Sequence, residues 1–307
     1  MMTTEIKITE NKAIEMGYVY AAITLLIWSG FVIVSRFGSK GVLNPFDIAA
    51  LRIGTAALVL APWWVPRLFK PKLRQLTWYQ SLLFALVAGI AYPLLAYTGF
   101  IYAPASHGAV LISGMLPFFT SILALFLLND SPNPVRAVGL LLIVTGVVTL
   151  FIANQHNGNQ DTSMYMRGDA ILLTASFVWA TFTVLLKFWN VRAFDVTLGV
   201  VAVSALIYLP IYILFLPKNI GMAPFGQIAL QAFFQGFLVV CCAMWTYAKA
   251  TELLGAVKVV IMMSGVPVVG TLLAVPFLGE TLTAGTALGA AITFLGALIG
   301  AMARYSE

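Results

Sequence analysis

The chain has 307 residues and a net charge of +6, and 61% of its residues are hydrophobic while only 9% are charged. Its mean hydropathy is +0.97. Soluble globular domains carry about 25% charged residues, so this chain has too few polar side chains to cover a folded surface in water. The composition excludes a soluble protein and predicts an all-α integral membrane protein with the lipid bilayer as a partner. We expect no nucleic-acid partner, because the basic residues fall mostly between apolar segments, as membrane topology signals do.

Residues 1–16 are predicted to be a cytoplasmic N-terminal tail. They mix acidic and basic side chains, and no small-residue cleavage site follows a short apolar core, so they do not resemble a cleavable signal peptide. An apolar segment of full bilayer width begins at Gly17. We therefore predict that the first apolar segment is a transmembrane helix that is retained.

Ten segments are long and apolar enough to cross the hydrocarbon core, which needs about 20 residues of helix. Most breaks between them carry Pro, Gly, Asn or a charged residue. A polar loop from Asn154 to Arg167 divides the chain near its middle. The predicted segments are approximately 17–36, 46–66, 79–103, 105–128, 134–153, 169–188, 194–216, 224–250, 255–278 and 283–303.

The basic residues predict the orientation of these helices. Most of the 17 Lys and Arg residues fall on one side of the membrane if the N-terminus lies in the cytoplasm. Because cytoplasmic loops carry the excess of positive charge, we predict a multi-pass protein of the cell (inner or plasma) membrane with both termini in the cytoplasm.

The two halves of the chain repeat one another at a spacing of about 150 residues. Gly17, Trp28, Phe31, Arg36 and Phe37 recur as Gly168, Trp179, Phe182, Lys187 and Phe188. Tyr97, Pro117, Gly139 and Gly146 recur as Tyr247, Pro267, Gly289 and Gly296.

Each half has five helices, an odd number, so the second half must enter the membrane from the other side. This predicts ten transmembrane helices arranged as two inverted five-helix repeats, 17–153 and 169–303, joined by a polar extracytoplasmic linker, 154–168. Inverted repeats are typical of alternating-access transporters, whose mirrored halves provide two similar gates around a central site.

Several motifs resemble those of the drug/metabolite transporter superfamily, in particular its EamA-type ten-helix members. The clearest is Val266-Pro267 followed by FLGETLT (277–283), Gly289 and Gly296. The first half has a looser copy, Leu116-Pro117 and LLNDSPN (127–133), in which Asn129-Asp130 replaces the usual Gly-Glu. The segment from Asn44-Pro45 to Arg52 also resembles the opening of the family's second helix. The resemblance implies a transporter that exports or exchanges a solute, with helices 1, 3, 4, 6, 8 and 9 lining a central cavity.

Polar and aromatic side chains within these helices are expected to face the interior, because polar groups are costly in lipid. An aromatic belt at the membrane interface explains Tyr18, Trp63, Trp64 and Trp78 but not Trp28, Trp179 or Tyr92, which lie well inside their segments. Helix packing is the alternative role for those three. The candidate substrate-binding residues in these helices are Trp28, Ser29, Tyr92, Tyr97, Trp179, Thr183, Trp245 and Tyr247.

Helices 4 and 9 are each predicted to break near the middle, at Ser113-Gly114 before Pro117 and at Ser264-Gly265 before Pro267. Proline removes a backbone hydrogen bond and strains the preceding turn. We predict gating kinks at Pro117 and Pro267; simple kinks for helix packing are the alternative.

His107 and Lys258 are two further candidate substrate-binding residues, at pseudo-equivalent positions on opposite faces. Each would be a gate residue or an anchor for an anionic group. The alternatives are snorkelling to the headgroups for Lys258 and a hydrogen-bonded helix start for His107. Arg52 is predicted to be structural, paired with a helix end or Asp47.

Every carboxylate is expected near a helix end, which favours uniport or exchange over proton symport, with His107 as the alternative proton carrier. No metal, nucleotide or other cofactor site is predicted, and Cys241 and Cys242 are expected to be buried thiols. An enzyme would need a catalytic constellation and a channel a polar lining, and the sequence predicts neither. An aromatic cavity with few charges favours a small organic metabolite, amino-acid-like or amphipathic, carried by a monomer or dimer.

Overall fold

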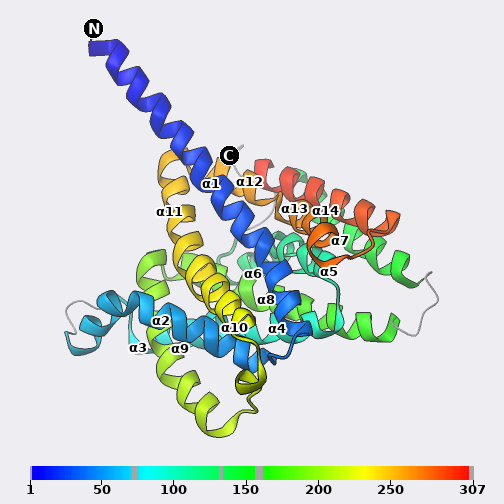
Figure 1. Cartoon of the computed structure of the whole chain (residues 1–307). Coiled ribbons are helices and arrows are strands. Elements are labelled where there is room, and N and C mark those ends of the chain that lie inside the picture. Colours follow the sequence, from blue (N-terminus) through cyan, green and yellow to red (C-terminus); the bar gives the residue numbers. More distant parts are fainter. Residues whose placement is uncertain (1, 71–74, 131–133, 156–161, 304–307) are drawn as a thin grey trace.

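A computed structural model describes residues 2–70, 75–130, 134–155 and 162–303. In these ranges the chain is a bundle of helices, and ten spans are long and apolar enough to cross a membrane (Figure 1). Helices dominate because lipid offers no partner to the backbone, whose N–H and C=O groups must bond within the segment. The predicted ten-helix, all-α membrane fold is confirmed.

The first half contains five of these spans. Their elements are α1 (Met2–Lys40), α2 (Pro45–Phe69), α3 (Trp78–Phe84), η2 (Ala85–Ala91), α4 (Tyr92–Tyr102), α5 (Ala105–Gly108), η3 (Ala109–Gly114), α6 (Leu116–Leu127) and α7 (Pro134–Gln155). The second half contains the other five, built from α8 (Thr162–Phe188), α9 (Ala193–Phe215), the short η4 (Ile220–Met222), α10 (Phe225–Gln231), η5 (Ala232–Cys242), α11 (Ala243–Leu254), α12 (Ala256–Met263), α13 (Val266–Leu278) and α14 (Ala284–Ala303).

Two helices begin earlier than the hydropathy predicts. α1 starts at Met2, so the predicted tail 1–16 is helical from its second residue and projects from the bundle (Figure 1). α8 starts at Thr162, inside the predicted linker 154–168, of which residues 156–161 lie outside the described part. Helical hydrogen bonding continues into polar sequence at both places, because a helix end is not tied to the edge of the apolar core. Asp169 therefore lies about two turns inside α8.

Glycines explain why α7 and α14 lie side by side (Figure 1). A Cβ atom on Gly139 would lie 2.7 Å from the carbonyl oxygen of Gly296, and one on Gly146 would lie 2.7 Å from that of Gly289. Small residues at these crossings let the two backbones approach closely, which drives helix association in membranes. The glycines that recur in the two halves thus face each other across their junction, Gly139 opposite Gly296 and Gly146 opposite Gly289.

The looser copy of the motif in the first half, LLNDSPN (127–133), keeps the backbone turn of its counterpart after α13. Gly279, which directly follows α13, has the left-handed φ of +65°, and Asn129, two residues after α6, has a φ of +51°. In both places the following amide donates back to the carbonyl of an alanine, Ala124 or Ala274. Asn tolerates the left-handed region better than other non-glycine residues, so it replaces Gly here without changing the turn.

The chain path defines two ends of the bundle. We call the end at which α1 enters the bundle and α14 finishes the N-terminal face. The other end, at which α1 finishes and α2 begins, we call the opposite face. Large apolar side chains such as Leu58, Phe126 and Phe277 lie exposed on the outside, as expected of surfaces that meet lipid tails.

Candidate substrate site

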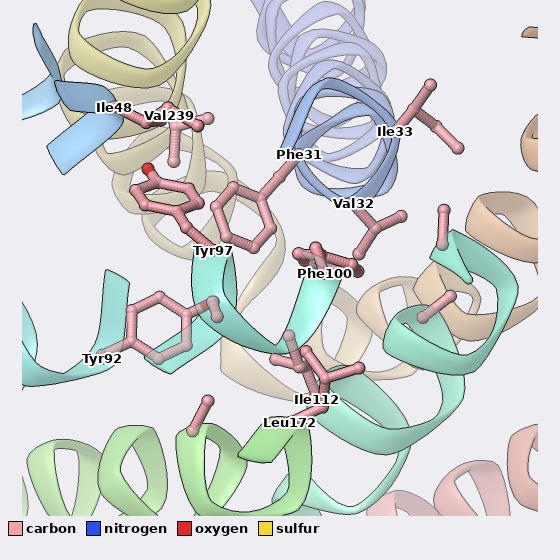
Figure 2. Packing of buried hydrophobic residues seen from close by; sticks show 14 of the residues in the cluster. Phe31, Val32, Ile33, Ile48, Tyr92, Tyr97, Phe100, Ile112, Leu172 and Val239 are labelled. Carbon is pink, nitrogen blue, oxygen red and sulfur yellow. The ribbon is translucent and has the colours of Figure 1, made fainter. Parts of the chain in front are cut away.

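Five aromatic side chains from α1, α4 and α8 meet inside the bundle, and we call them the aromatic cluster: Phe31, Tyr92, Tyr97, Phe100 and Trp179. The ring of Phe31 lies 6.1 Å from that of Tyr92 and 6.3 Å from that of Tyr97 (Figure 2). Trp179 lies 4.5 Å from Tyr92. These centroid separations are within or at the limit of the range for favourable aromatic pairs, so sequence-predicted residues from both halves are brought together.

Trp28 extends this apolar region towards the N-terminal face. It packs against the main core and stacks on Tyr247 of α11, with ring centroids 5.3 Å apart. Two predicted residues, from helices 1 and 8, are therefore in direct contact. Both side chains are partly exposed.

Hydrogen-bonding groups line one side of the aromatic cluster. The Tyr97 hydroxyl donates to Gln235 Oε1 at 3.2 Å, and Gln235 Nε2 donates to the Ser35 hydroxyl at 3.1 Å. Gln231, one turn earlier, donates to the Val34 carbonyl at 2.9 Å. The site thus combines flat apolar rings with a row of amides and hydroxyls, the mixture typical of small-molecule sites.

Arg52 is the charged residue of this region. Its guanidinium lies 5.9 Å from the centre of the Phe31 ring and beside the Tyr97 hydroxyl. Only 7% of the residue is exposed, and its Nη1 atom has no hydrogen-bond partner. The sequence predicted a structural role for Arg52, and its position beside the aromatic cluster was missed.

Of the two predicted partners of Arg52, a helix end or Asp47, the pairing with Asp47 is wrong. Asp47 closes a capping box with Asn44 at the start of α2, and its carboxylate accepts hydrogen bonds from the Tyr212 hydroxyl at 2.6 Å and the Asn219 amide. These bonds occupy Asp47 at the helix end. Asp47 and Arg52 are five residues apart and so do not share the three- or four-residue spacing at which side chains meet on a helix.

Three spans contain π-helical stretches, which hydropathy does not predict: η2 in the third span, η3 in the fourth and η5 in the eighth. Gln235 lies within η5, and Tyr92 directly follows η2. Such stretches are uncommon and are frequent at functional sites, because they displace side chains from the helical register. All three occur in spans that the family resemblance assigns to the cavity lining.

The predicted breaks in the fourth and ninth spans are present. α6 and α13 both begin with proline in their first turn, at Pro117 and Pro267. A Cβ atom on Gly114 would lie 3.7 Å from Pro267 Cγ. The broken helices of the two halves therefore approach each other in the interior.

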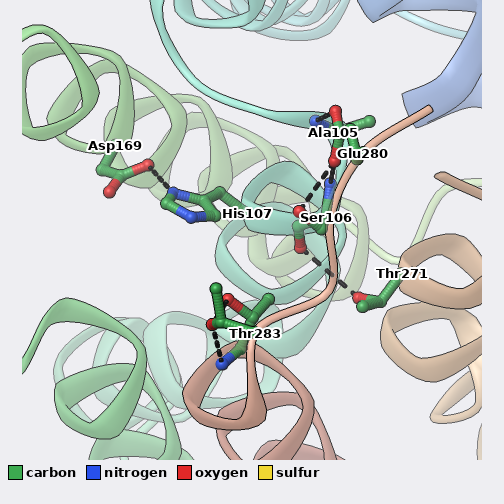
Figure 3. A network of polar contacts seen from close by, with 8 residues as sticks. Ala105, Ser106, His107, Asp169, Thr271, Glu280 and Thr283 are labelled. Atoms are coloured by element: carbon green, nitrogen blue, oxygen red, sulfur yellow. Dashed lines mark hydrogen bonds and ion pairs between the residues drawn. The ribbon is translucent and has the colours of Figure 1, made fainter. Parts of the chain in front are cut away.

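His107 forms a buried pair with Asp169 across the two halves, from α5 to α8 (Figure 3). Nδ1 of His107 lies 2.9 Å from Oδ1 of Asp169, and the side chains are 3% and 2% exposed. The ring also contacts Tyr165 edge to face. The expectation that every carboxylate lies near a helix end is wrong for Asp169, because α8 starts earlier than its hydrophobic stretch.

Glu280, from the family-like motif after α13, joins the halves at the opposite face (Figure 3). Its carboxylate accepts from the amide of Ala105 at 2.6 Å and from the amide and hydroxyl of Ser106 at 3.0 and 2.8 Å. These bonds satisfy amides at the start of α5. Arg36 lies close to Glu280 and donates to the carbonyls of Phe100 and Ile101.

Asp130 is the counterpart of Glu280 in the first half but has different partners. Its carboxylate lies 3.3 Å from Arg136 and 4.0 Å from Lys187 at the N-terminal face. Neither α5 nor its counterpart α12 is capped by the side chain of its own N-cap residue, Pro104 or Gly255, so the bonds from Glu280 are what distinguish the start of α5. The two ends of the bundle thus differ in how their helix starts are held.

The remaining predicted residues lie outside the aromatic cluster. Trp245 is 53% exposed and packs on Tyr20, and Lys258 is exposed at the start of α12. Thr183 donates to the carbonyl of Trp179 within its own helix. Ser29 is fully buried, its hydroxyl has no partner, and its backbone approaches Gly270 of α13. Their substrate-binding roles remain predictions.

Within the described residues, no group of three or more His, Cys, Asp and Glu side chains lies close enough together to hold a metal ion. Cys241 and Cys242 are free and half-buried rather than fully buried as predicted.

A model of the EamA-like transporter family matches the chain twice, at residues 15–152 and 166–301. The chain is 26% identical to the uncharacterized transporter YyaM of Bacillus subtilis (strain 168) over 272 residues, which is 84% of this chain and 85% of that one. An uncharacterized transporter of Archaeoglobus fulgidus is 29% identical over 167 residues, 53% of this chain, and the match spans only 55% of that relative. A crystal structure of a protein at 21% identity superposes with a TM-score of 0.61 and covers 97% of this chain and 99% of that chain, which supports the fold.

Proposed function

The chain belongs to the EamA-like transporter family, and from this premise we propose that it is an alternating-access secondary transporter of a small organic metabolite, amino-acid-like or amphipathic, that works as an exporter or exchanger. It is a transporter and not an enzyme in this proposal. It acts in the cell membrane, with both termini in the cytoplasm, as the distribution of basic residues favours.

The aromatic cluster and its row of polar groups carry this proposal. Tyr92, Tyr97 and Trp179 come from both halves and meet beside Gln235. Ser176, one turn before Trp179, donates to the carbonyl of Ile112 in the broken fourth span. A site between two repeats, next to interrupted helices, is where secondary transporters bind their substrates. Aromatic faces bind apolar groups, while amides and hydroxyls orient a polar end.

The unequal ends of the bundle support alternating access. The bonds from Glu280 to the start of α5 hold the opposite face together, while Asp130, its counterpart, is bound to Arg136 and Lys187. In an inverted repeat the two gates exchange conformations during the cycle. We propose that Asp130 takes the place at α12 that Glu280 has at α5 when the N-terminal face closes.

The His107–Asp169 pair favours a second candidate, proton-coupled transport. Uniport or exchange was favoured because every carboxylate was expected near a helix end, whereas Asp169 is buried in a pair with His107. Buried pairs of ionisable residues mark proton relays in many transporters. The pair joins the two halves, so its protonation state can be linked to their relative movement.

Uptake into proteoliposomes tests these proposals. The purified protein is given labelled amino acids, amphipathic amines and organic acids, with and without a pH gradient. Saturable uptake that ignores the gradient supports exchange or uniport, and uptake that requires it supports proton coupling. Sustained electrical current without saturation would instead indicate a channel, and no uptake of any solute would refute the proposed substrate class.

A further inference from the structure

Arg52 is a buried positive charge without a matching negative one. It lies about 10 Å along α2 from the opposite face, at 1.5 Å per residue, and only 7% of it is exposed. No carboxylate of the described residues forms an ion pair with it. Charged side chains inside a membrane protein are costly and are kept mainly where they serve a function.

The groups around Arg52 do not neutralise it. Phe31 offers a ring face at 5.9 Å and Tyr97 a hydroxyl, while the nearest acid along α2, Asp47, is bound elsewhere. The Nη1 atom is buried without any acceptor. A guanidinium normally uses its planar fork of N–H groups to bind a carboxylate. What the site lacks is therefore an anionic acceptor.

A row of glutamines runs from the opposite face towards this position. A cavity of about 380 Å³ opens there, lined by Arg36, Phe37, Lys40, Gly41, Gln227, Leu278 and Glu280. Gln227, Gln231 and Gln235 follow at four-residue spacing along α10 and η5 and so lie on one face of the helix. Gln227 lines the cavity, Gln231 has a buried Oε1 atom without a partner, and Gln235 bonds to Tyr97 beside Arg52. The row offers polar groups from the surface to the cluster.

We propose that Arg52 binds the carboxylate of the transported solute, which is an organic acid or a zwitterion with an apolar body, and that Gln227, Gln231 and Gln235 line its path to the opposite face. The inference rests on the proposed transport function and names the charge of its substrate. The carboxylate completes the buried guanidinium, and its apolar body lies against the aromatic cluster. One guanidinium matches one negative charge, which favours a carboxylate over a doubly charged phosphate.

Binding to the purified protein in detergent tests the charge requirement directly. The probes are L-phenylalanine, L-leucine and 3-phenylpropionate, each compared with its own carboxamide, and inorganic phosphate. A ligand that binds the folded state stabilises it by RT ln(1 + [L]/Kd) and so raises the melting temperature. We expect the acids to raise it in the wild-type protein while the carboxamides and phosphate leave it unchanged.

Variants of Arg52 separate binding from folding. We expect Arg52→Gln to weaken acid binding by about 30-fold or more, the usual effect of removing one partner of a buried charge pair. Without ligand it should melt at or above the wild-type temperature, because an uncompensated buried charge has been removed. Arg52→Lys should retain part of the binding. Arg67→Gln is the matched control, because Arg67 lies on the same helix but pairs with Asp195 outside the cluster, and it should bind the acids like the wild type.

Equal stabilisation by acids and carboxamides, no stabilisation by any acid, or undiminished acid binding by Arg52→Gln would each overturn the proposal. The comparison of acids with carboxamides on the wild-type protein tests the need for a carboxylate even if a variant does not fold. Uptake assays on the same proteins keep the two proposals apart. Uptake of neutral solutes that is unaffected by Arg52→Gln overturns the carboxylate site and leaves the transporter standing, whereas no uptake of any solute refutes the proposed transport of small organic metabolites.

Discussion

Replacing Glu280 by Gln should open the opposite face. The carboxylate accepts three hydrogen bonds from Ala105 and Ser106. The carboxamide of Gln can keep only the bonds to one oxygen, because its nitrogen is a donor and cannot accept from the backbone amides. Hydrogen bonds to charged groups contribute about 1.5–3 kcal/mol each when well formed. Because this site is only part-buried, we take about 2–3 kcal/mol for the change. If these bonds exist only while the opposite face is closed, the equilibrium shifts towards the open state by about 30- to 150-fold.

A cysteine at position 39 reports the shift. Ser39 is 9% exposed, near the end of α1, and donates to the Tyr97 carbonyl, so Ser39→Cys is a small change at a site shielded when the face is closed. In a background with Cys241 and Cys242 replaced by Ala, the rate of labelling by a membrane-impermeant maleimide should rise with the open population. Glu252→Gln is the control, because Glu252 pairs with Lys249 at the N-terminal face. A folded Glu280→Gln protein that is labelled no faster than the control would refute the reasoning.

Three other changes have expected outcomes. Asp169→Asn keeps an acceptor for His107 but removes the charge, so uptake measured with and without a pH gradient should lose any dependence on the gradient; retained dependence would exclude this pair as the proton carrier. Gly146→Ala places a Cβ 2.7 Å from a backbone oxygen of α14 and should destabilise the protein by about 1–3 kcal/mol, seen as a lower melting temperature, whereas Gly300→Ala, with nothing within 4 Å, should not. Trp179→Ala removes an aromatic face and should raise the KM of uptake by up to about tenfold; an unchanged KM would count against this residue as cavity lining.

The aromatic residues of the site could largely be identified from the sequence, because Trp28, Tyr92 and Trp179 lie too deep in their segments to belong to an interfacial belt. The same reasoning also selected Trp245, which packs on Tyr20 and is largely exposed. Depth along a helix says how far a residue lies from the membrane surface. It does not say which way the residue points, because lipid and protein surround an apolar helix with similar chemistry.

Ionisable residues were placed less well. Arg52 was predicted to pair with a helix end or Asp47, and Asp169 was placed near a helix end, because each prediction used the distance along the chain. The structure pairs Asp47 with Tyr212 and Asp169 with His107, and both partners are distant in sequence. The sequence does not show which distant residues form such pairs, since the cost of burying a charge depends on all the groups that surround it in the folded protein.

The sequence by itself determined that this protein lies in a membrane, that ten helices cross it and that two halves repeat, because hydropathy, helix length and odd helix count are properties of the chain and of the bilayer. It also marked Gly139 and Gly146 together with their counterparts Gly289 and Gly296, without saying that they face each other. Only the tertiary structure decided which side chains share the interior, that Arg52 lies there without a carboxylate, and that Glu280 holds the start of α5 while Asp130 holds no such place. Those facts depend on helix rotation and packing, which are set by contacts between segments far apart in the chain and not by any segment alone.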